Sequence, residues 1–225
     1  MNFPPGQIKA CVFDAFGTLF NLQIPFEQVD ALAEGKGKAL MDIWRNKQLE
    51  YTWLHSLMQD YQSFDVLTKK ALSFAMQSQG ISNPQLYDLL LPIYERADCF
   101  PQVPGVLQEL KDRGIQCAIL SNGTPKMLEA GATNAGIHPL LDTIFSVAQV
   151  GVFKPDPKVY QMVLEAWQLS KTELLFISSN QWDIAGAAQF GWTTVWLNQY
   201  NQVKEPFEPG AQLTITQLRE LPLLF

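Results

Sequence analysis

Four short stretches of the sequence each place polar side chains directly after an apolar run. They are Val12–Leu19, Leu120–Gly123, Val152–Pro157 and Ile177–Asp183. Asp14 in the first is followed by a glycine-bearing turn, which would present a carboxylate nucleophile beside backbone N–H groups. The second could cradle an anion, the third fixes Lys154 immediately before a helix, and the fourth supplies Asp183. Taken singly, each also suits a structural role, such as a capping aspartate, a polar turn or a solvated lysine.

The apolar runs before these polar residues are typical of buried parallel strands. The runs are Ala10–Phe13, Gln116–Leu120, Thr143–Phe145 and Leu174–Ile177. Helical stretches lie between them, one over 104–113 and one over 157–167 that begins after Asp156 as cap. This alternation predicts an α/β fold, a doubly wound (Rossmann-like) parallel sheet. Ligands bind such sheets at the carboxyl ends of the strands, where Asp14 and Ser178 fall.

A long stretch interrupts this alternation. From Leu22 to Asp98 the apolar residues recur at helical spacing, and no convincing strand is present. We expect an all-helical cap at 22–98, inserted into a core domain of 1–21 and 99–225. Because the insert leaves the core just after Asp14, it should lie over the strand ends. The tail after Tyr200 predicts a loop followed by a short packing segment.

The composition excludes several classes of protein. The chain has 225 residues, of which 47% are hydrophobic and 17% charged, and its net charge is -6. No basic stripe is present, so we expect no nucleic-acid partner, and an anionic substrate would need local cations and N–H groups. No signal pattern and no bilayer-length apolar run occur, so we expect a cytoplasmic protein without membrane contact. The three cysteines are expected to be buried, and the two histidines lack partners at metal-ligand spacing.

Together and in this order, the four stretches resemble the haloacid dehalogenase superfamily over essentially the whole chain. The details resemble the L-2-haloacid dehalogenases rather than the phosphatases, which carry a second aspartate two residues after the nucleophile. Phe16 occupies that position here and cannot transfer a proton. Asp14 and Asp183 with Lys154 close by would make a poor magnesium site. The resemblance therefore implies no metal and no cofactor.

The cap contains a further match. The segment Ile43–Thr52 resembles the dehalogenase segment that carries the arginine for the leaving halide, which is Arg45 here. Asn46 stands where relatives often have glutamine, and Phe16 where many have tyrosine, so pocket size and substrate preference stay open. By the same resemblance, the apolar residues that line the pocket are Leu49, Phe64 and Trp182.

The resemblance implies a two-step hydrolysis of 2-haloacids. Asp14, oriented by Thr18 and kept ionised by Lys154, would displace the halide and form an ester with inversion at carbon. The groups for the substrate carboxylate would be Ser121 and the backbone N–H groups of Ala15, Phe16 and Asn122. The groups for the halide would be Arg45 and Asn122. Water would then hydrolyse the ester with Asp183 as base and Lys154 as the competing base. The residues that hold the water and the charged network would be Ser178, Asn180 and Tyr160.

Two other functions stay open. A phosphatase on the same fold would need magnesium and a phosphate ester, and Phe16 speaks against it. A non-catalytic binding protein would be favoured by the loss of a charged site residue, and all of them are present. Halide release from chloroacetate or fluoroacetate with a chelator present separates these functions. The expected partners are a 2-haloacid and water. A homodimer could use the region of Trp44 and Trp53, which packing within one chain would also explain.

Overall fold

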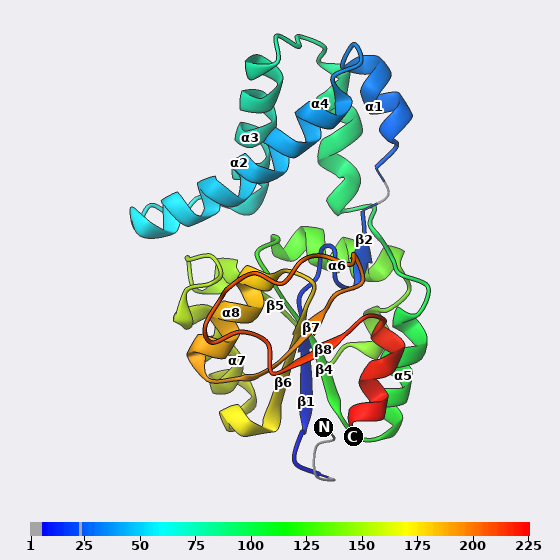
Figure 1. Cartoon of the computed structure of the whole chain (residues 1–225), viewed down its shortest axis with the longest axis vertical. Coiled ribbons are helices and arrows are strands. Elements are labelled where there is room, and N and C mark those ends of the chain that lie inside the picture. The colour runs from blue at the N-terminus through cyan, green and yellow to red at the C-terminus, as the bar shows by residue number, and fades with distance from the viewer. Residues whose placement is uncertain (1–5, 23) are drawn as a thin grey trace.

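A computed structural model describes residues 6–22 and 24–225. Residues 1–5 of the predicted core and residue 23 of the predicted cap lie outside the described part. Its centre is a six-stranded parallel sheet with the order β5-β4-β1-β6-β7-β8 (Figure 1). The strands are β1 (Ala10–Phe13), β4 (Gln116–Ser121), β5 (Thr143–Ser146), β6 (Leu174–Ser178), β7 (Thr193–Leu197) and β8 (Leu213–Ile215). The predicted fold class and the four predicted strands are confirmed, whereas β7 and β8 were not predicted.

The position of β1 explains why the site forms at its end. All four residues of β1 are buried, and Phe13 pairs with Ile119 of β4 on one side and Ile177 of β6 on the other. The order of the strands reverses here, because the chain continues from β1 to β4 in one direction and to β6 in the other. Ligands bind doubly wound sheets at such a switch point. Asp14 therefore emerges between the ends of two neighbouring strands.

Helices cover both faces of the sheet. The core helices are α5 (Val103–Asp112), α6 (Pro125–Asn134), α7 (Pro157–Trp167) and α8 (Gln181–Phe190). Figure 1 shows α7 and α8 on one side of the sheet, and α5 with the C-terminal 3-10 helix η5 (Leu218–Leu224) on the other. Asp156 caps α7 as predicted, because its carboxylate accepts a hydrogen bond from the backbone N–H of Lys158 at 2.8 Å.

The inserted helices lie over the carboxyl ends of the strands (Figure 1). They are α1 (Phe26–Leu32), α2 (Gly37–Leu57), α3 (Phe64–Ser78), α4 (Gln85–Leu90) and the 3-10 helix η1 (Leu91–Tyr94). A short antiparallel pair, β2 (Phe20–Asn21) and β3 (Asp98–Cys99), joins the chain where it leaves and re-enters the core. The division of the chain into a cap of 22–98 and a two-part core stays a prediction.

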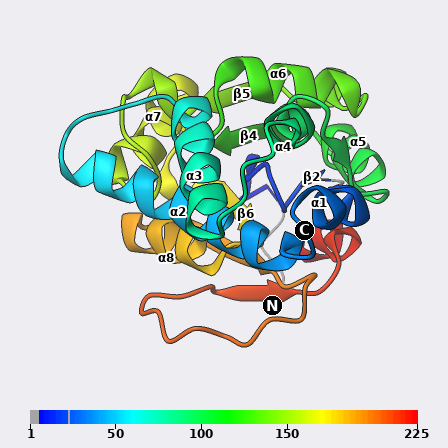
Figure 2. The same ribbon diagram turned by 90° about the horizontal axis from the view of Figure 1, so that it is seen from above.

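The segment after β7 runs along the edge of the molecule to β8, as Figure 2 shows from above. The predicted loop is present, and the residues beyond it pack on the core: Ile215, Leu218 and Leu221 are buried. Cys11 and Cys117 are buried as expected, whereas Cys99 is half-buried. Within residues 6–22 and 24–225, no helix is both long and apolar enough to cross a membrane.

Candidate active site

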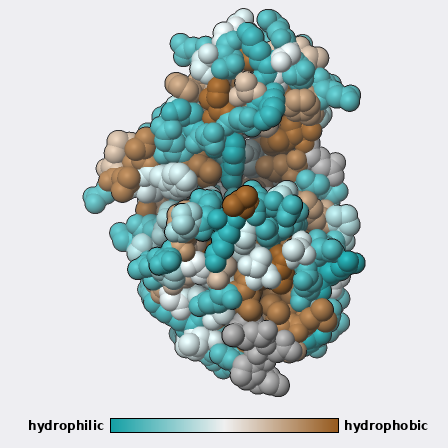
Figure 3. All heavy atoms as spheres, viewed as in Figure 1, coloured by the Kyte–Doolittle hydropathy of each residue, from teal (hydrophilic) through white to brown (hydrophobic). Residues whose placement is uncertain are grey.

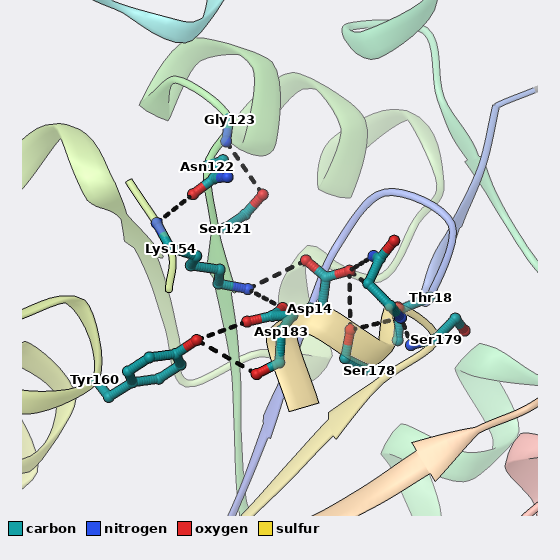
Figure 4. Close-up of polar contacts among 11 residues, drawn as sticks. Asp14, Thr18, Ser121, Asn122, Gly123, Lys154, Tyr160, Ser178, Ser179 and Asp183 are labelled. Carbon is teal, nitrogen blue, oxygen red and sulfur yellow. Dashed lines mark hydrogen bonds and ion pairs between the residues drawn. The ribbon is translucent and has the colours of Figure 1, made fainter. Parts of the chain in front are cut away.

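Asp14 stands at the end of β1 and is surrounded by hydrogen-bond donors (Figure 4). Its Oδ2 accepts from Thr18 Oγ1 at 3.0 Å, from Asn180 Nδ2 at 2.9 Å and from Ser178 Oγ at 3.4 Å. Its Oδ1 faces Lys154 Nζ at 3.2 Å. Asp14 is buried at 7% exposure, and three donors fix one carboxylate oxygen while the other has a single cationic neighbour.

Lys154 joins Asp14 to a second carboxylate. Its ammonium is 2.7 Å from Asp183 Oδ2, and the Tyr160 hydroxyl donates to Asp183 Oδ1 at 3.0 Å. Asp183 is fully buried and Lys154 is 1% exposed, so solvent screens this network little. The sequence placed these residues on separate elements, and the fold brings them together (Figure 4).

Burial and charge shift the pKa values of this network. Burial raises the pKa of Asp183 to about 6, although the Lys154 ammonium acts in the opposite direction. Burial alone would lower the pKa of Lys154, but the carboxylates of Asp14 and Asp183 outweigh it and the pKa is raised. Burial and the Asp183 charge raise the pKa of Tyr160 well above its usual value. The lysine is therefore held as an ammonium, while Asp183 titrates near neutrality.

The end of β4 is tied to the loop that carries Lys154. Asn122 Oδ1 accepts from the backbone N–H of Lys154 at 3.0 Å, and Ser121 Oγ accepts from the Gly123 N–H at 3.2 Å. Gly123 lies so close to Phe16 that a Cβ there would sit 2.8 Å from its ring. Two predicted anion-binding residues, Ser121 and Asn122, are therefore held at the strand end, each 8% exposed or less.

The turn after Asp14 is shaped by its glycine. Gly17 has a φ of +83°, a conformation that side chains disfavour, and the Ala15 carbonyl accepts from the N–H groups of Thr18, Leu19 and Phe20. Thr18 Oγ1 also accepts from the Ser179 N–H at 2.9 Å, which joins this turn to the loop after β6. This hydrogen bond fixes the turn after Asp14 to the end of β6, the strand that leads into α8 and Asp183.

A cavity of about 490 Å³ separates the inserted helices from the core. Figure 3 shows a hollow between the upper and lower parts of the molecule, with hydrophobic side chains beside it. Arg45 and Gln48 of α2 line this cavity, as do Phe16 and Asn180 from the core. The remaining lining residues are Gly17, Asn21, Leu22, Ile24, Met41, Asp42, Trp44, Ile93, Tyr94, Ser179, Tyr200 and Gln202. The predicted halide residue therefore faces the same space as the loop that carries Asp14.

Of the residues predicted to bind substrate or halide, six are not among the described residues that line this cavity: Ala15, Ser121, Asn122, Leu49, Phe64 and Trp182. Leu49 is half-buried on α2, and Phe64 is buried with its ring edge-on to Tyr94 at 5.7 Å. Trp182 packs edge-on against Trp53 at 5.6 Å and lines a separate cavity of about 640 Å³. Packing between the inserted helices and the core therefore accounts for Trp182. Phe64 packs on Tyr94 within the insert and on Phe153 of the core, whose ring lies 6.4 Å away.

Sequence reasoning missed Gln48, Tyr94 and Tyr200, which line the cavity. A usable signal exists for Gln48, because it follows Trp44 by four residues and so lies on the buried face of α2. No comparable signal marks Tyr94 or Tyr200, which reach the cavity from a 3-10 helix and from a loop. Among the described residues, no three His, Cys, Asp or Glu side chains are grouped as metal ligands.

The fold and the site define a haloacid dehalogenase-like hydrolase, the family that matches residues 8–191. The chain is 39% identical over 219 residues to the (S)-2-haloacid dehalogenase of Pseudomonas sp. (strain YL), covering 97% of this chain and 94% of that one. It is 35% identical over 195 residues to haloacetate dehalogenase H-2 of Moraxella sp. (strain B), covering 86% and 87%.

A solved structure supports a finer assignment. The L-2-haloacid dehalogenase of Xanthobacter autotrophicus, with chloropropionic acid covalently bound, superimposes with a TM-score of 0.84 at 32% identity and covers 96% of this chain and 98% of that one. The chain therefore belongs to the L-2-haloacid dehalogenase family, and the resemblance stated from the sequence is confirmed.

Proposed function

We propose that this protein hydrolyses the carbon–halogen bond of short (S)-2-haloacids and haloacetates, releasing halide and a 2-hydroxy acid. The observation that carries this proposal is the Asp14 carboxylate, which has one oxygen fixed by three donors and the other beside the Lys154 ammonium. Family membership supports the reaction class, and the cavity between α2 and the core offers space for the substrate.

In the first step Asp14 acts as the nucleophile. Its Oδ1 attacks the carbon that bears the halogen, a C–O bond forms, and the halide leaves with the electron pair of the broken bond. Attack from the rear inverts that carbon. Because Oδ2 is fixed by Thr18, Asn180 and Ser178, the attacking oxygen is held in one orientation without the entropy cost of an unrestrained carboxylate.

Two anionic groups must be accommodated in this step. The Ser121 hydroxyl already accepts from the Gly123 N–H, so its own hydrogen can be donated to the substrate carboxylate. The turn N–H groups proposed to join it belong to Ala15, Phe16 and Asn122. Arg45, with the Asn122 amide, would receive the halide, and this electrostatic stabilisation grows as the bond breaks.

In the second step water hydrolyses the ester. Water attacks Cγ of Asp14 and its proton passes to Asp183. The Cγ–Oδ1 bond then breaks, and the leaving alkoxide takes this proton from Asp183 to become the hydroxy acid, which restores the base. The raised pKa of Lys154 favours the ammonium form, which makes Asp183 the better base. Tyr160 orients Asp183, and Ser178 and Asn180 are proposed to hold the water and the ester.

The cavity bears on substrate preference. Its volume of about 490 Å³ is within the usual range for small-molecule sites, and its wall includes Trp44, Met41 and Ile93. We expect acids with an alkyl substituent to be accepted as well as haloacetates. Fluoroacetate is the hardest case, because fluoride is the poorest leaving group, and its turnover stays a prediction that a halide-release panel would test.

The decisive experiment follows oxygen through one turnover. In a single turnover in heavy-oxygen water, the label should enter Asp14, and the product hydroxyl should carry the original carboxylate oxygen. Asp14→Asn should lower halide release by about a thousandfold or more. Label found in the product alone would contradict the ester route, and magnesium-dependent cleavage of p-nitrophenyl phosphate without halide release would contradict the reaction class.

Assembly as a homodimer and a cytoplasmic location stay predictions. Trp44 is buried and Trp53 packs on Trp182, so this region is used within one chain. Leu57 and Met58, at the end of α2, are 80% and 60% exposed and offer an apolar surface to a second copy. Light scattering of the purified protein would determine the mass of the assembly.

A further inference from the structure

We propose that Gln48 is a positioning residue that holds Arg45 in place for the leaving halide, an inference that rests on the proposed function. Gln48 lies on α2 three residues after Arg45 and is 1% exposed. Its Oε1 accepts from Arg45 Nη1 at 2.9 Å, and both residues line the cavity that faces Asn180 and Phe16.

The amide of Gln48 can adopt one orientation. The Thr68 hydroxyl donates to the Phe64 carbonyl at 2.6 Å, so toward Gln48 it can act as an acceptor. Gln48 Nε2 donates to Thr68 Oγ1 at 2.7 Å and to Tyr94 OH at 2.8 Å, which uses both of its hydrogens. Its carbonyl oxygen must therefore point to Arg45. This network joins three segments, α2, α3 and η1, of which α2 and α3 lie side by side in Figure 2.

The hydrogen-bond partner of Arg45 is the Gln48 amide, which carries no charge. Arg45 forms no ion pair within residues 6–22 and 24–225. A carboxylate at position 48 would hold the guanidinium equally well but would neutralise the charge that attracts a halide. An amide restrains the guanidinium and leaves its charge available as negative charge develops on the halogen. Loss of this restraint should lower the rate most for 2-chloro acids and least for 2-iodo acids, because a poorer leaving group needs more stabilisation.

A double-mutant cycle tests this role. Gln48→Met preserves side-chain length without the hydrogen bonds, and we expect it to lower kcat on a 2-chloro acid about tenfold and on the 2-iodo acid about twofold. In the Arg45→Ala background the same change should cost less than about twofold, since Gln48 acts through Arg45. An equal loss in both backgrounds, or an equal loss for chloride and iodide, would overturn the inference.

A matched control separates positioning from general damage to the cap. Thr52 is buried on α2 and its hydroxyl donates to the Leu49 carbonyl at 2.7 Å. Thr52→Val therefore breaks a buried hydrogen bond of the same helix without touching Arg45. It should preserve kcat and the chloride-to-iodide ratio while lowering the unfolding midpoint. A change of that ratio in Thr52→Val would overturn the assignment to Gln48.

A second variant covers the case in which Gln48→Met does not fold. Gln48→Glu keeps the size of the side chain and can accept hydrogen bonds from Arg45 and Tyr94, so the fold should be retained. The Thr68 hydroxyl already donates to the Phe64 carbonyl, so this variant loses the hydrogen bond to Thr68. It should lower kcat on the chloro acid at least as much as Gln48→Met, and wild-type kcat would overturn the charge argument. Failure of the proposed function is distinguishable, because the wild-type protein would then release no halide at all.

Discussion

At the residue scale, the site contains three buried charged side chains, because Lys154 lies between Asp14 and Asp183. A single ammonium, that of Lys154, serves two carboxylates, and both distances are 3.2 Å or less. Burial is the main cause that raises the pKa of Asp183 to about 6, and the nearby Asp14 carboxylate adds to the increase, while the Lys154 ammonium acts against it. This value places the group where a base at neutral pH is both ionised and able to accept a proton.

The pH dependence of ester hydrolysis follows from this charge arrangement. Asp183 must be ionised to accept a proton, so the rate of ester hydrolysis should be constant at high pH and fall tenfold per pH unit below the pKa of Asp183. In the ester this pKa lies below the value of about 6 of the free protein, because esterification removes the Asp14 charge that raises it. The Tyr160 hydrogen bond lowers the pKa of Asp183, so Tyr160→Phe should move the midpoint to higher pH. Rapid-quench measurement of the second step across pH gives both midpoints. A midpoint that stays fixed in Tyr160→Phe, or moves to lower pH, would contradict the assignment of Asp183.

Some residues of the candidate site can be predicted from the sequence, and others cannot. Asp14 and Asp183 each come after an apolar run and Lys154 comes immediately before a helix start, and parallel strands bring their ends to one edge. Gln48 and Tyr94 could not be assigned in this way. Their contact with each other at 2.8 Å depends on how α2 and η1 pack, and the spacing within either helix does not encode it.

At the scale of elements, the packing of α8 against α7 positions the second carboxylate. Asp183 lies in the first turn of α8, and Tyr160 reaches it from α7. The close approach depends on Gly186, where a Cβ would lie 2.6 Å from Tyr160 OH and would also overlap Pro155, the residue after Lys154. The absence of a side chain at this point lets both partners of Asp183 come within hydrogen-bond distance.

Gly186→Ala should therefore harm both activity and stability. The methyl group must displace Tyr160 or Pro155, so we expect a stability loss of about 1–3 kcal/mol and a fall in kcat of about tenfold or more. Denaturant unfolding and halide release measure the two effects. Gly105→Ala on α5 is the control, because a Cβ there meets nothing within 4 Å, and alanine should stabilise the helix by up to about 1 kcal/mol. Equal behaviour of the two variants would contradict the packing argument.

The elements that escaped prediction have a physical explanation. The strand β7 carries no polar residue of the site at its end, and β8 has three residues, of which Ile215 is buried. So short a strand is defined by pairing with its neighbour, here Leu197 with Ile215, rather than by its own pattern.

The long helix α2 was predicted from its own pattern. Its apolar spacing predicted a helix correctly, yet Leu57 at its end is exposed, because periodicity does not say where packing stops.

At the scale of the whole molecule, the inserted helices and the core meet beside the loop that carries Lys154. Ser56 Oγ, near the end of α2, accepts from the backbone N–H of Phe153 at 3.0 Å, and the Tyr61 ring packs against Phe153 at 5.2 Å. Phe153 precedes Lys154, so the same contact that docks the cap also fixes the residue before the central ammonium. The net charge of -6 gives the molecule no general attraction for an anion, so under the proposed function this task falls to Arg45 of the inserted helices and to Ser121 and the N–H groups at the strand ends.

Ser56→Ala should weaken this junction. It leaves the buried Phe153 N–H without its acceptor, so we expect a stability loss of about 1–3 kcal/mol. Because the cap carries Arg45 and the core carries Asp14, a looser junction should raise KM more than it lowers kcat. Ser78→Ala is the matched control, since Ser78 donates to the Ala75 carbonyl within its own helix and contacts no core residue through that bond. If both variants have the same unfolding midpoint and the same KM, the hydrogen bond from Phe153 does not couple the cap to the site, and the apolar contacts of Tyr61 and Trp53 must account for docking.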